Sequence, residues 1–218
     1  MFKTKFYKAP IIVLVLYFFS APTFSQTVYS SDAASTFYFT IGLTSTKLIN
    51  DTNNYKSGIL FTGGFIYSVD VYDKINVNLE CLYTGKGFKQ DAPIIKYRYF
   101  YIDVPLYLQL KLSDNIKFNV GAQYSIFTNS QVVYIDGAKQ NGINIEKFNA
   151  IKNKDYGFLL GAEIDISKNL TMAARYTLSG STFFEKNQVN FGVFQLSFNY
   201  VAFRSYQQFF HKKEKTVK

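Results

Sequence analysis

Alternation of apolar and polar residues is the dominant pattern along the chain, and one stretch shows it over two consecutive segments. In "YIDVPLYLQLKLSDNIKFNVGAQYSIF", residues 101–127, every second position from Ile102 to Leu112 is apolar. Most positions between them are polar, and after "SDN" the alternation resumes from Ile116 to Ile126. A period of two is typical of a strand with two different faces. The stretch therefore predicts two antiparallel strands joined by a tight turn.

The same period recurs in eight segments, each close to the length that crosses a bilayer when a strand is tilted. These segments are 37–44, 59–69, 75–84, 101–112, 116–127, 156–166, 170–178 and 191–203. Three connections are short and rich in residues that favour turns, namely 72–74, 113–115 and 167–169. The other connections are predicted to be long loops, at 45–57, 85–97, 128–155 and 179–190. Short turns at one end and long loops at the other are typical of outer-membrane barrels.

We therefore predict an all-β fold, an eight-stranded antiparallel up-and-down transmembrane β-barrel. The alternative is a soluble barrel of the lipocalin kind, with its apolar face inward. Two features favour the transmembrane version. The apolar face is bulkier than a lumen of eight strands can hold, and the polar face carries glycines and charges in mid-strand.

Some residues do not fit the simple pattern. Pro105 cannot donate to a strand ladder, so we expect a bulge or kink there. Leu60, Ile66 and Leu82 are apolar residues on faces that should be polar, and a small lumen can hold them.

The two ends of the chain differ from the strand region. The first residues, "MFKTKFYKAPIIVLVLYFFSAPTFSQ", combine lysines, an apolar run and small residues before Gln26, as a secretory signal peptide does. We predict a signal peptide at 1–25, a short periplasmic lead at 26–35, the barrel at 36–203 and a basic tail at 204–218. A membrane-anchoring helix is the alternative for the first segment, but its apolar run is too short to span a bilayer comfortably.

Charge and composition narrow the class of partner. The chain has 218 residues and a formal charge of +9, but the predicted tail holds five cations against Glu214 alone. Because the tail concentrates the basicity, we expect no nucleic-acid-binding face on the domain. Aromatic residues are 19% of the chain, with 23 Phe and 18 Tyr, which favours strands. The single cysteine, Cys81, excludes an intrachain disulfide.

The polar face of the predicted barrel carries charged residues in mid-strand. We expect a lumen polar network of Glu80, Asp103, Glu163 and Arg175, because unpaired charges in a narrow interior are costly. This network would fill and stiffen the barrel, and a proton or ion path is the alternative. Asp103 should pair with Arg175 or with another interior donor.

The sequence contains few features that would indicate an enzyme. The only histidine, His211, lies beyond the last strand, which argues against a serine–histidine lipase. The chain carries no Walker loop, no dinucleotide fingerprint and no clustered Cys and His. We therefore expect no catalytic residues, no metal and no cofactor.

The motif "KYRYFY", residues 96–101, is denser in aromatics than an interfacial girdle needs. We predict a loop-base interaction patch of Lys96, Tyr97, Arg98 and Tyr99. It would bind a protein partner or the phosphates of lipopolysaccharide.

Several motifs resemble those of PorT-like outer-membrane β-barrel proteins, an eight-stranded family of Bacteroidota type. "YIDVPLYLQLKL", "KFNVGAQYSIF", "DYGFLLGAEIDISKNLTMAARYTLSG" and "VFQLSFNYVAF" are similar to successive strands of that family, over about 36–203. Asp103 falls on its acidic position, Pro105 on its proline and Arg175 on its arginine. The resemblance implies an integral protein of the cell outer membrane. The chain departs from many barrels in continuing past the aromatic Phe203.

Three functional hypotheses remain from the sequence. The first is a non-enzymatic outer-membrane protein that acts through its loops or tail in secretion, assembly or surface interaction. Its partners would be outer-membrane lipid and proteins of a secretion or assembly system. The alternatives are a narrow pore for small solutes and a lipid-modifying barrel enzyme.

Overall fold

The computed structural model describes residues 34–49, 55–72, 74–91, 94–134, 154–180 and 190–206, and their regular elements are all strands. No helix in these ranges is long and apolar enough to cross a membrane. The strands are β1 (Ala34–Ile49), β2 (Lys56–Tyr72), β3 (Ile75–Asp91), β4 (Ile94–Lys111), β5 (Ile116–Tyr134), β6 (Lys154–Ser167), β7 (Leu170–Ser179) and β8 (Asn190–Tyr206).

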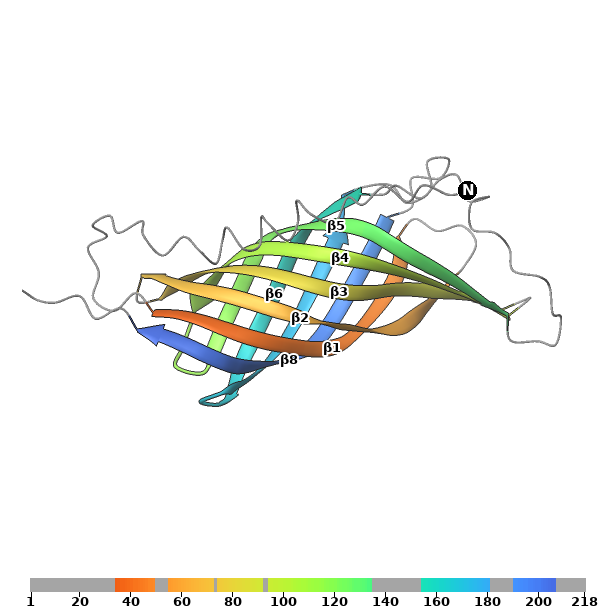
Figure 1. Ribbon diagram of the computed structural model, residues 1–218. Helices are drawn as coiled ribbons and strands as arrows, with labels where there is room; N and C mark the ends of the chain where they lie inside the picture. The colour runs from red at the N-terminus through yellow and green to blue at the C-terminus, as the bar shows by residue number, and fades with distance from the viewer. Residues whose placement is uncertain are drawn as a thin grey trace, which may run out of the picture. The chain divides into compact units, whose positions relative to one another are not determined.

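The eight strands form a closed barrel in the order of the chain (Figure 1). Each strand pairs antiparallel with its neighbour in sequence, and β1 closes the ring by pairing with β8, where Ile41 lies opposite Phe198 and Leu43 opposite Leu196. The predicted all-β, up-and-down fold is therefore confirmed.

The outer and inner faces of the barrel have opposite polarity. Outward apolar side chains are widely exposed, as at Ile41 (70%), Leu106 (54%) and Leu108 (47%). Between them lie buried polar side chains such as Asn119 and Gln195. A band of this size would be unfavourable in water, whereas lipid chains cover it at no such cost.

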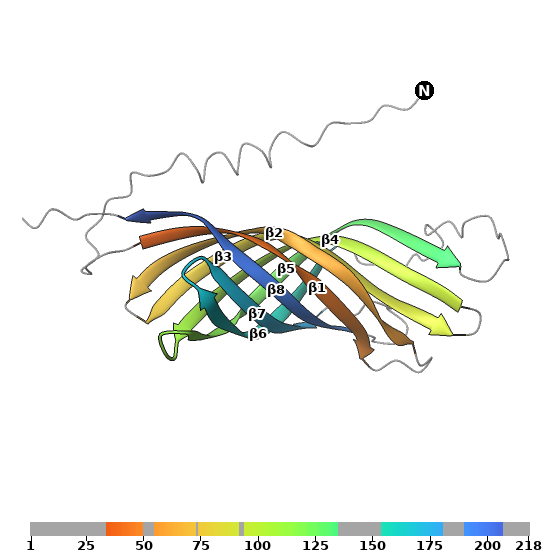
Figure 2. The same ribbon diagram turned by 90° about the horizontal axis from the view of Figure 1, so that it is seen from below.

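The strands are longer than predicted at the long-loop end. Residues 85–97 were expected to form a loop, but β3 continues to Asp91 and β4 begins at Ile94. β5 likewise runs to Tyr134, and the other strands end short of this tip of β3, β4 and β5 (Figures 1 and 2). The prediction failed because apolar alternation marks the part of a strand that faces lipid. Strand pairing itself continues beyond it.

Pro105 does not create the expected bulge. It pairs with Gln123 on β5 in unbroken register, and on the β3 side the pairs resume at Leu79–Leu106 and Leu82–Asp103 without a shift. The register shift between β4 and β5 lies instead at Phe100 and Tyr101, where β5 carries one extra residue, Thr128.

The three apolar residues predicted on the polar face lie in the barrel interior or against a glycine. Ile66 and Leu82 are buried, at 4% and 1% exposure. Leu60 lies against β3, where a Cβ atom on Gly85 would come within 2.7 Å of the Leu60 Cβ. At the same level the Thr44 hydroxyl donates to the Gly85 carbonyl oxygen at 2.5 Å, which joins β1 directly to β3.

The predicted segments map onto the described residues as follows. The predicted barrel, 36–203, lies within the span from Ala34 to Tyr206 that the strands occupy. The predicted signal peptide at 1–25 and most of the lead at 26–35 lie outside the described residues. Of the predicted tail, Arg204 to Tyr206 belong to β8, and residues 207–218 lie outside the described residues.

Candidate functional site

The inward side chains of the barrel are packed along its length. The inward row of β3 shows this most directly, because each of its members is 5% exposed or less. The row consists of Asn76, Asn78, Glu80, Leu82, Thr84, Lys86 and Phe88. An eight-stranded barrel has an interior just wide enough for side chains. The interior is therefore the first candidate site, and its side-chain contacts determine whether it is a packed lumen or a path for solutes.

An ion pair between β3 and β7 occupies the middle of the lumen. The Arg175 guanidinium donates to Glu80 Oε2 at 2.7 Å, and both side chains are almost fully buried. The Tyr107 hydroxyl donates to the other oxygen, Oε1, at 2.6 Å. Glu80 thus uses both carboxylate oxygens, which offsets the loss of hydration that a buried charge suffers. Three strands, β3, β4 and β7, are held together through one carboxylate.

Glu163 lies in the same polar interior but does not join this ion pair. It accepts a hydrogen bond from the Asn119 amide at 2.7 Å. A cavity of about 10 Å³ lies beside it, which is about the space that one water molecule needs. The cavity is lined by Tyr38, Ile66, Asn78, Tyr107, Gln109, Glu163 and Asn199.

Asp103 pairs with Lys86, another interior donor, and not with Arg175. Its carboxylate lies 3.3 Å from Lys86 Nζ, while Arg175 is engaged with Glu80. Lys86 also donates to the Ser125 hydroxyl at 3.1 Å and lies 4.3 Å from the centre of the Tyr101 ring. The predicted network therefore exists as separate pairs and not as one cluster of four residues.

Lys86 is the interior residue that the sequence did not reveal. It lies in "TGKGF", which was interpreted as loop because the alternation of large apolar residues stops at Tyr83. The available signal was its spacing: Lys86 follows Leu82 and Thr84 at intervals of two, on the inward face. Extending the period of two past the apolar residues would have placed it in the lumen.

More accessible ion pairs lie near the short-turn end. Lys117 donates to Asp165 at 2.8 Å, and the Thr171 hydroxyl donates to the same carboxylate oxygen at 2.7 Å. Lys111 and Asp70 lie 3.7 Å apart, and each side chain is 32% exposed. These pairs contribute less than the buried ones because water screens them.

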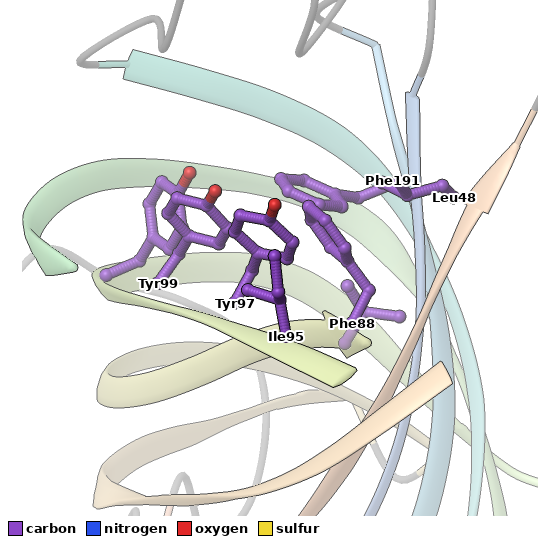
Figure 3. Close-up of a cluster of buried hydrophobic side chains, with 8 residues drawn as sticks. Leu48, Phe88, Ile95, Tyr97, Tyr99 and Phe191 are labelled. Carbon is purple, nitrogen blue, oxygen red and sulfur yellow. The ribbon is translucent and has the colours of Figure 1, made fainter. Parts of the chain in front are cut away.

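The long-loop end of the barrel is filled by apolar and aromatic side chains. We call this the aromatic cluster, and Figure 3 shows its side chains directed toward one another from β1, β3, β4 and β8. Its buried members are Leu48, Phe88, Ile95, Tyr97, Tyr99, Tyr101, Phe191 and Val193. Phe88 stacks on Tyr97 with ring centres 5.0 Å apart and on Tyr99 at 5.7 Å.

The predicted loop-base patch is therefore divided between two faces of β4. Tyr97 and Tyr99 belong to the interior, at 8% and 2% exposure, whereas Lys96 and Arg98 alternate with them on the outer face and are half-buried. The four residues cannot form one surface. The prediction was wrong because it assigned the motif to a loop, where alternate side chains need not point to opposite sides.

The polarity of the two faces inverts along β4. From Tyr101 to Lys111 the outer face carries Ile102, Leu106 and Leu108, and polar residues point inward. From Ile95 to Tyr99 the apolar rings point inward and the cations outward. β8 changes in the same way, since inward Gln195 gives way to inward Val193 and Phe191. The inversion marks the level at which the surroundings of the barrel change from lipid chains to headgroups and water.

A closed barrel with an apolar outer band, a polar lumen and short turns at one end is an integral membrane β-barrel of the outer-membrane type. The chain belongs to the outer membrane protein beta-barrel domain family, whose model matches residues 11–201. The protein is therefore an outer-membrane protein. By the usual orientation of such barrels, the short turns face the periplasm and the tip of β3, β4 and β5 faces the outside.

Outer-membrane barrels of low sequence identity are among the solved structures that resemble the chain. Ail, the attachment invasion locus protein of Yersinia pestis, is 16% identical, with 79% of this chain and 99% of that chain covered and a TM-score of 0.46. Neisserial surface protein A is 14% identical, with 77% and 97% covered and a TM-score of 0.48. OprG of Pseudomonas aeruginosa is 13% identical, with 81% and 96% covered and a TM-score of 0.39. No curated protein matches the chain.

Proposed function

We propose that the protein is a non-enzymatic outer-membrane scaffold, which binds protein partners at the cell surface through the tip of β3, β4 and β5. The filled lumen is the observation that supports this proposal. The inward row of β3 is buried from Asn76 to Phe88, with ion pairs in the middle and the aromatic cluster at the outer end. A barrel packed in this way offers its outer end, and not its interior, for interaction.

The extended strands support the choice of the outer end. β3, β4 and β5 have 17, 18 and 19 residues. β2 and β8 also have 17 but end short of the tip (Figures 1 and 2), and β7 has 10. About 9–11 residues suffice for a tilted strand to cross the bilayer, so the extra length of the tip is not needed for anchoring. Pairing and the aromatic cluster hold these extra residues rigid. A rigid exposed sheet loses little entropy when it binds.

The partners are expected to be proteins of a secretion or assembly system. The resemblance to PorT-like proteins supports this class of partner.

Conductance in planar lipid bilayers tests the filled lumen. We expect the purified protein to give no stable single-channel steps. The matched variant carries Glu80→Ser together with Arg175→Ser, which removes both charges and two long side chains without leaving an unpaired ion. Steps from this variant alone would support the filled lumen, provided that a heat-dependent gel shift shows both proteins folded. Steady channels from the unaltered protein would overturn the proposal in favour of a narrow pore.

Site-specific photo-crosslinking in the native membrane tests the outer tip. A crosslinking amino acid at Gln131, exposed on β5, should give discrete protein adducts that are identified by mass spectrometry. The same amino acid at Asn115, exposed in a short turn, is the matched control for the opposite end. Adducts at Asn115 alone, or none at Gln131, would contradict binding through the tip.

A further inference from the structure

The outer face of β3 and β4 carries a group of cations just beyond the apolar band. Lys89 on β3 is the register partner of Lys96 on β4, and Arg98 follows two residues along β4 on the same face. Lys56 on β2 is in turn the register partner of Lys89. We call Lys56, Lys89, Lys96 and Arg98 the outer basic row.

Lysines that face each other across neighbouring strands repel. Directly opposed residues in an antiparallel pair have Cβ atoms about 5 Å apart, and like charges at that separation destabilise the sheet. Among the side chains that the structure describes, Lys89, Lys96 and Arg98 form no ion pair with a carboxylate; Lys86, Lys111, Lys117 and Arg175 form ion pairs elsewhere in the barrel. An anion that bridges these cations would relieve the repulsion.

The level of the row relative to the membrane indicates which anion it meets. Phe100, which is 7% exposed, stacks on Tyr83 with ring centres 5.5 Å apart, and Phe61 lies beside both. The exposed rings of Tyr83 and Phe61 form the upper edge of the lipid-facing band. Arg98 is two residues beyond Phe100 and Lys96 is four. At about 3.3 Å per residue these are about 7 and 13 Å along a tilted strand, which is the depth of the polar headgroups.

We propose that the outer basic row binds the phosphate groups of the phosphorylated glycolipid in the outer leaflet, the lipid A portion of lipopolysaccharide. Arg98 offers a planar pair of N–H donors to a phosphate, and Lys89 and Lys96 offer compact positive charges on either side of the strand boundary. The exposed rings of Tyr83 and Phe61 lie one level below, where they contact acyl chains. Charge and depth thus match one ligand with an anionic head and apolar tails.

Binding of lipid A to the protein in nanodiscs tests this site. The probe is bis-phosphorylated lipid A, and dephosphorylated lipid A is the matched ligand. The variant carries Lys89→Gln together with Lys96→Gln. We expect the variant to bind the phosphorylated lipid more weakly by a factor of about ten or more, because each cation at the surface contributes to anionic-lipid binding. Its affinity for the dephosphorylated lipid should equal that of the unaltered protein.

Two further variants separate a site from general charge. Lys74→Gln with Lys168→Gln removes the same charge from exposed positions at the short-turn end and should leave affinity unchanged. Lys89→Arg with Lys96→Arg keeps the charge and should retain binding, which also shows that the strands still pair. Equal losses from both glutamine variants, or equal affinity of the unaltered protein for both lipids, would overturn the proposal. Gln131 is the register partner of Arg98 and lies beside the outer basic row, so the two proposals are separated by their readouts. Unchanged lipid A binding by the Lys89→Gln, Lys96→Gln variant overturns the lipid site, whereas the absence of protein adducts at Gln131 overturns the partner-binding tip.

Discussion

The lumen within the membrane and the aromatic cluster beyond it fill the same barrel by opposite means. In the membrane the interior is held by the Glu80–Arg175 ion pair and by hydrogen bonds such as that from Asn119 to Glu163. Beyond the apolar band the interior is packed with Phe88, Tyr97 and Tyr99. The strands are continuous, and the change of surroundings decides which residues the interior holds.

The reason lies in where the hydrophobic effect acts. Lipid already accommodates the outer leucines, so burying apolar groups inside the spanning part gains little, and polar pairs specify the packing there. Beyond the apolar band the outer face meets headgroups and water, and removing Phe88 from water stabilises the tip as in a soluble protein. The two regions should therefore respond differently to substitution.

The largest effect is expected from breaking the central ion pair. Glu80→Gln leaves the buried Arg175 without its counter-charge and should lower the free energy of unfolding by about 3–5 kcal/mol. Guanidinium titration in lipid vesicles, followed by circular dichroism, measures it. Glu80→Gln with Arg175→Met is the control and should be less destabilised than Glu80→Gln alone. A loss below about 1 kcal/mol for the single variant would mean that the pair is solvated.

Truncation in the aromatic cluster should act locally. Phe88→Ala removes a ring that is 2% exposed and should destabilise the tip by about 3 kcal/mol. We expect faster protease cleavage and hydrogen exchange in β3, β4 and β5 beyond Tyr101, with the heat-dependent gel shift of the barrel unchanged. Leu82→Ala, in the same strand but inside the spanning part, is the control and should alter the gel shift. If Phe88→Ala loosened the spanning part as much as the tip, the two regions would not be separable.

The position of the membrane edge can be tested on the outer face of β4. Leu108→Arg places a charge within the apolar band and should lower the free energy of unfolding in vesicles by about 2–4 kcal/mol. Ile102→Arg, on the same face next to the inversion, should cost about 0–1 kcal/mol. Equal losses at both positions would show that the band extends beyond Phe100.

The spanning part was predictable because both faces follow one rule. Lipid requires apolar residues at every second position, so Ile102, Leu106 and Leu108 reveal both the strand and, by elimination, the inward position of Asp103. The partner of Asp103 was not predictable to the same degree. Which cation reaches it depends on register and side-chain length across the lumen, and these favour Lys86 over Arg175.

The tip was not predictable from the same rule because its environment is different. "GKGFKQDAPIIKYRYF" lacks an apolar period, and its tyrosines are interior residues, whereas Lys89, Lys96 and Arg98 lie on the outer face. Gly85 and Gly87 permit the close approach of Leu60 to β3. A two-residue period of cations alternating with rings was present, and it indicates a strand whose faces have exchanged roles.

The smallest effect should come from the ion pair at the water-exposed end of the lumen. Lys111 and Asp70 are 3.7 Å apart and 32% exposed, so Lys111→Gln should change the free energy of unfolding by less than about 1 kcal/mol. The effect should also shrink as salt is raised, because ions screen exposed charges. Lys117→Gln, whose partner Asp165 also holds Thr171, should cost more than Lys111→Gln and depend less on salt, since the Lys117 side chain is 12% exposed. If Lys111→Gln were as damaging as Glu80→Gln, the polar interior would act as one cooperative unit from the periplasmic turns to the aromatic cluster. A graded series would instead mean that each pair contributes according to its own burial.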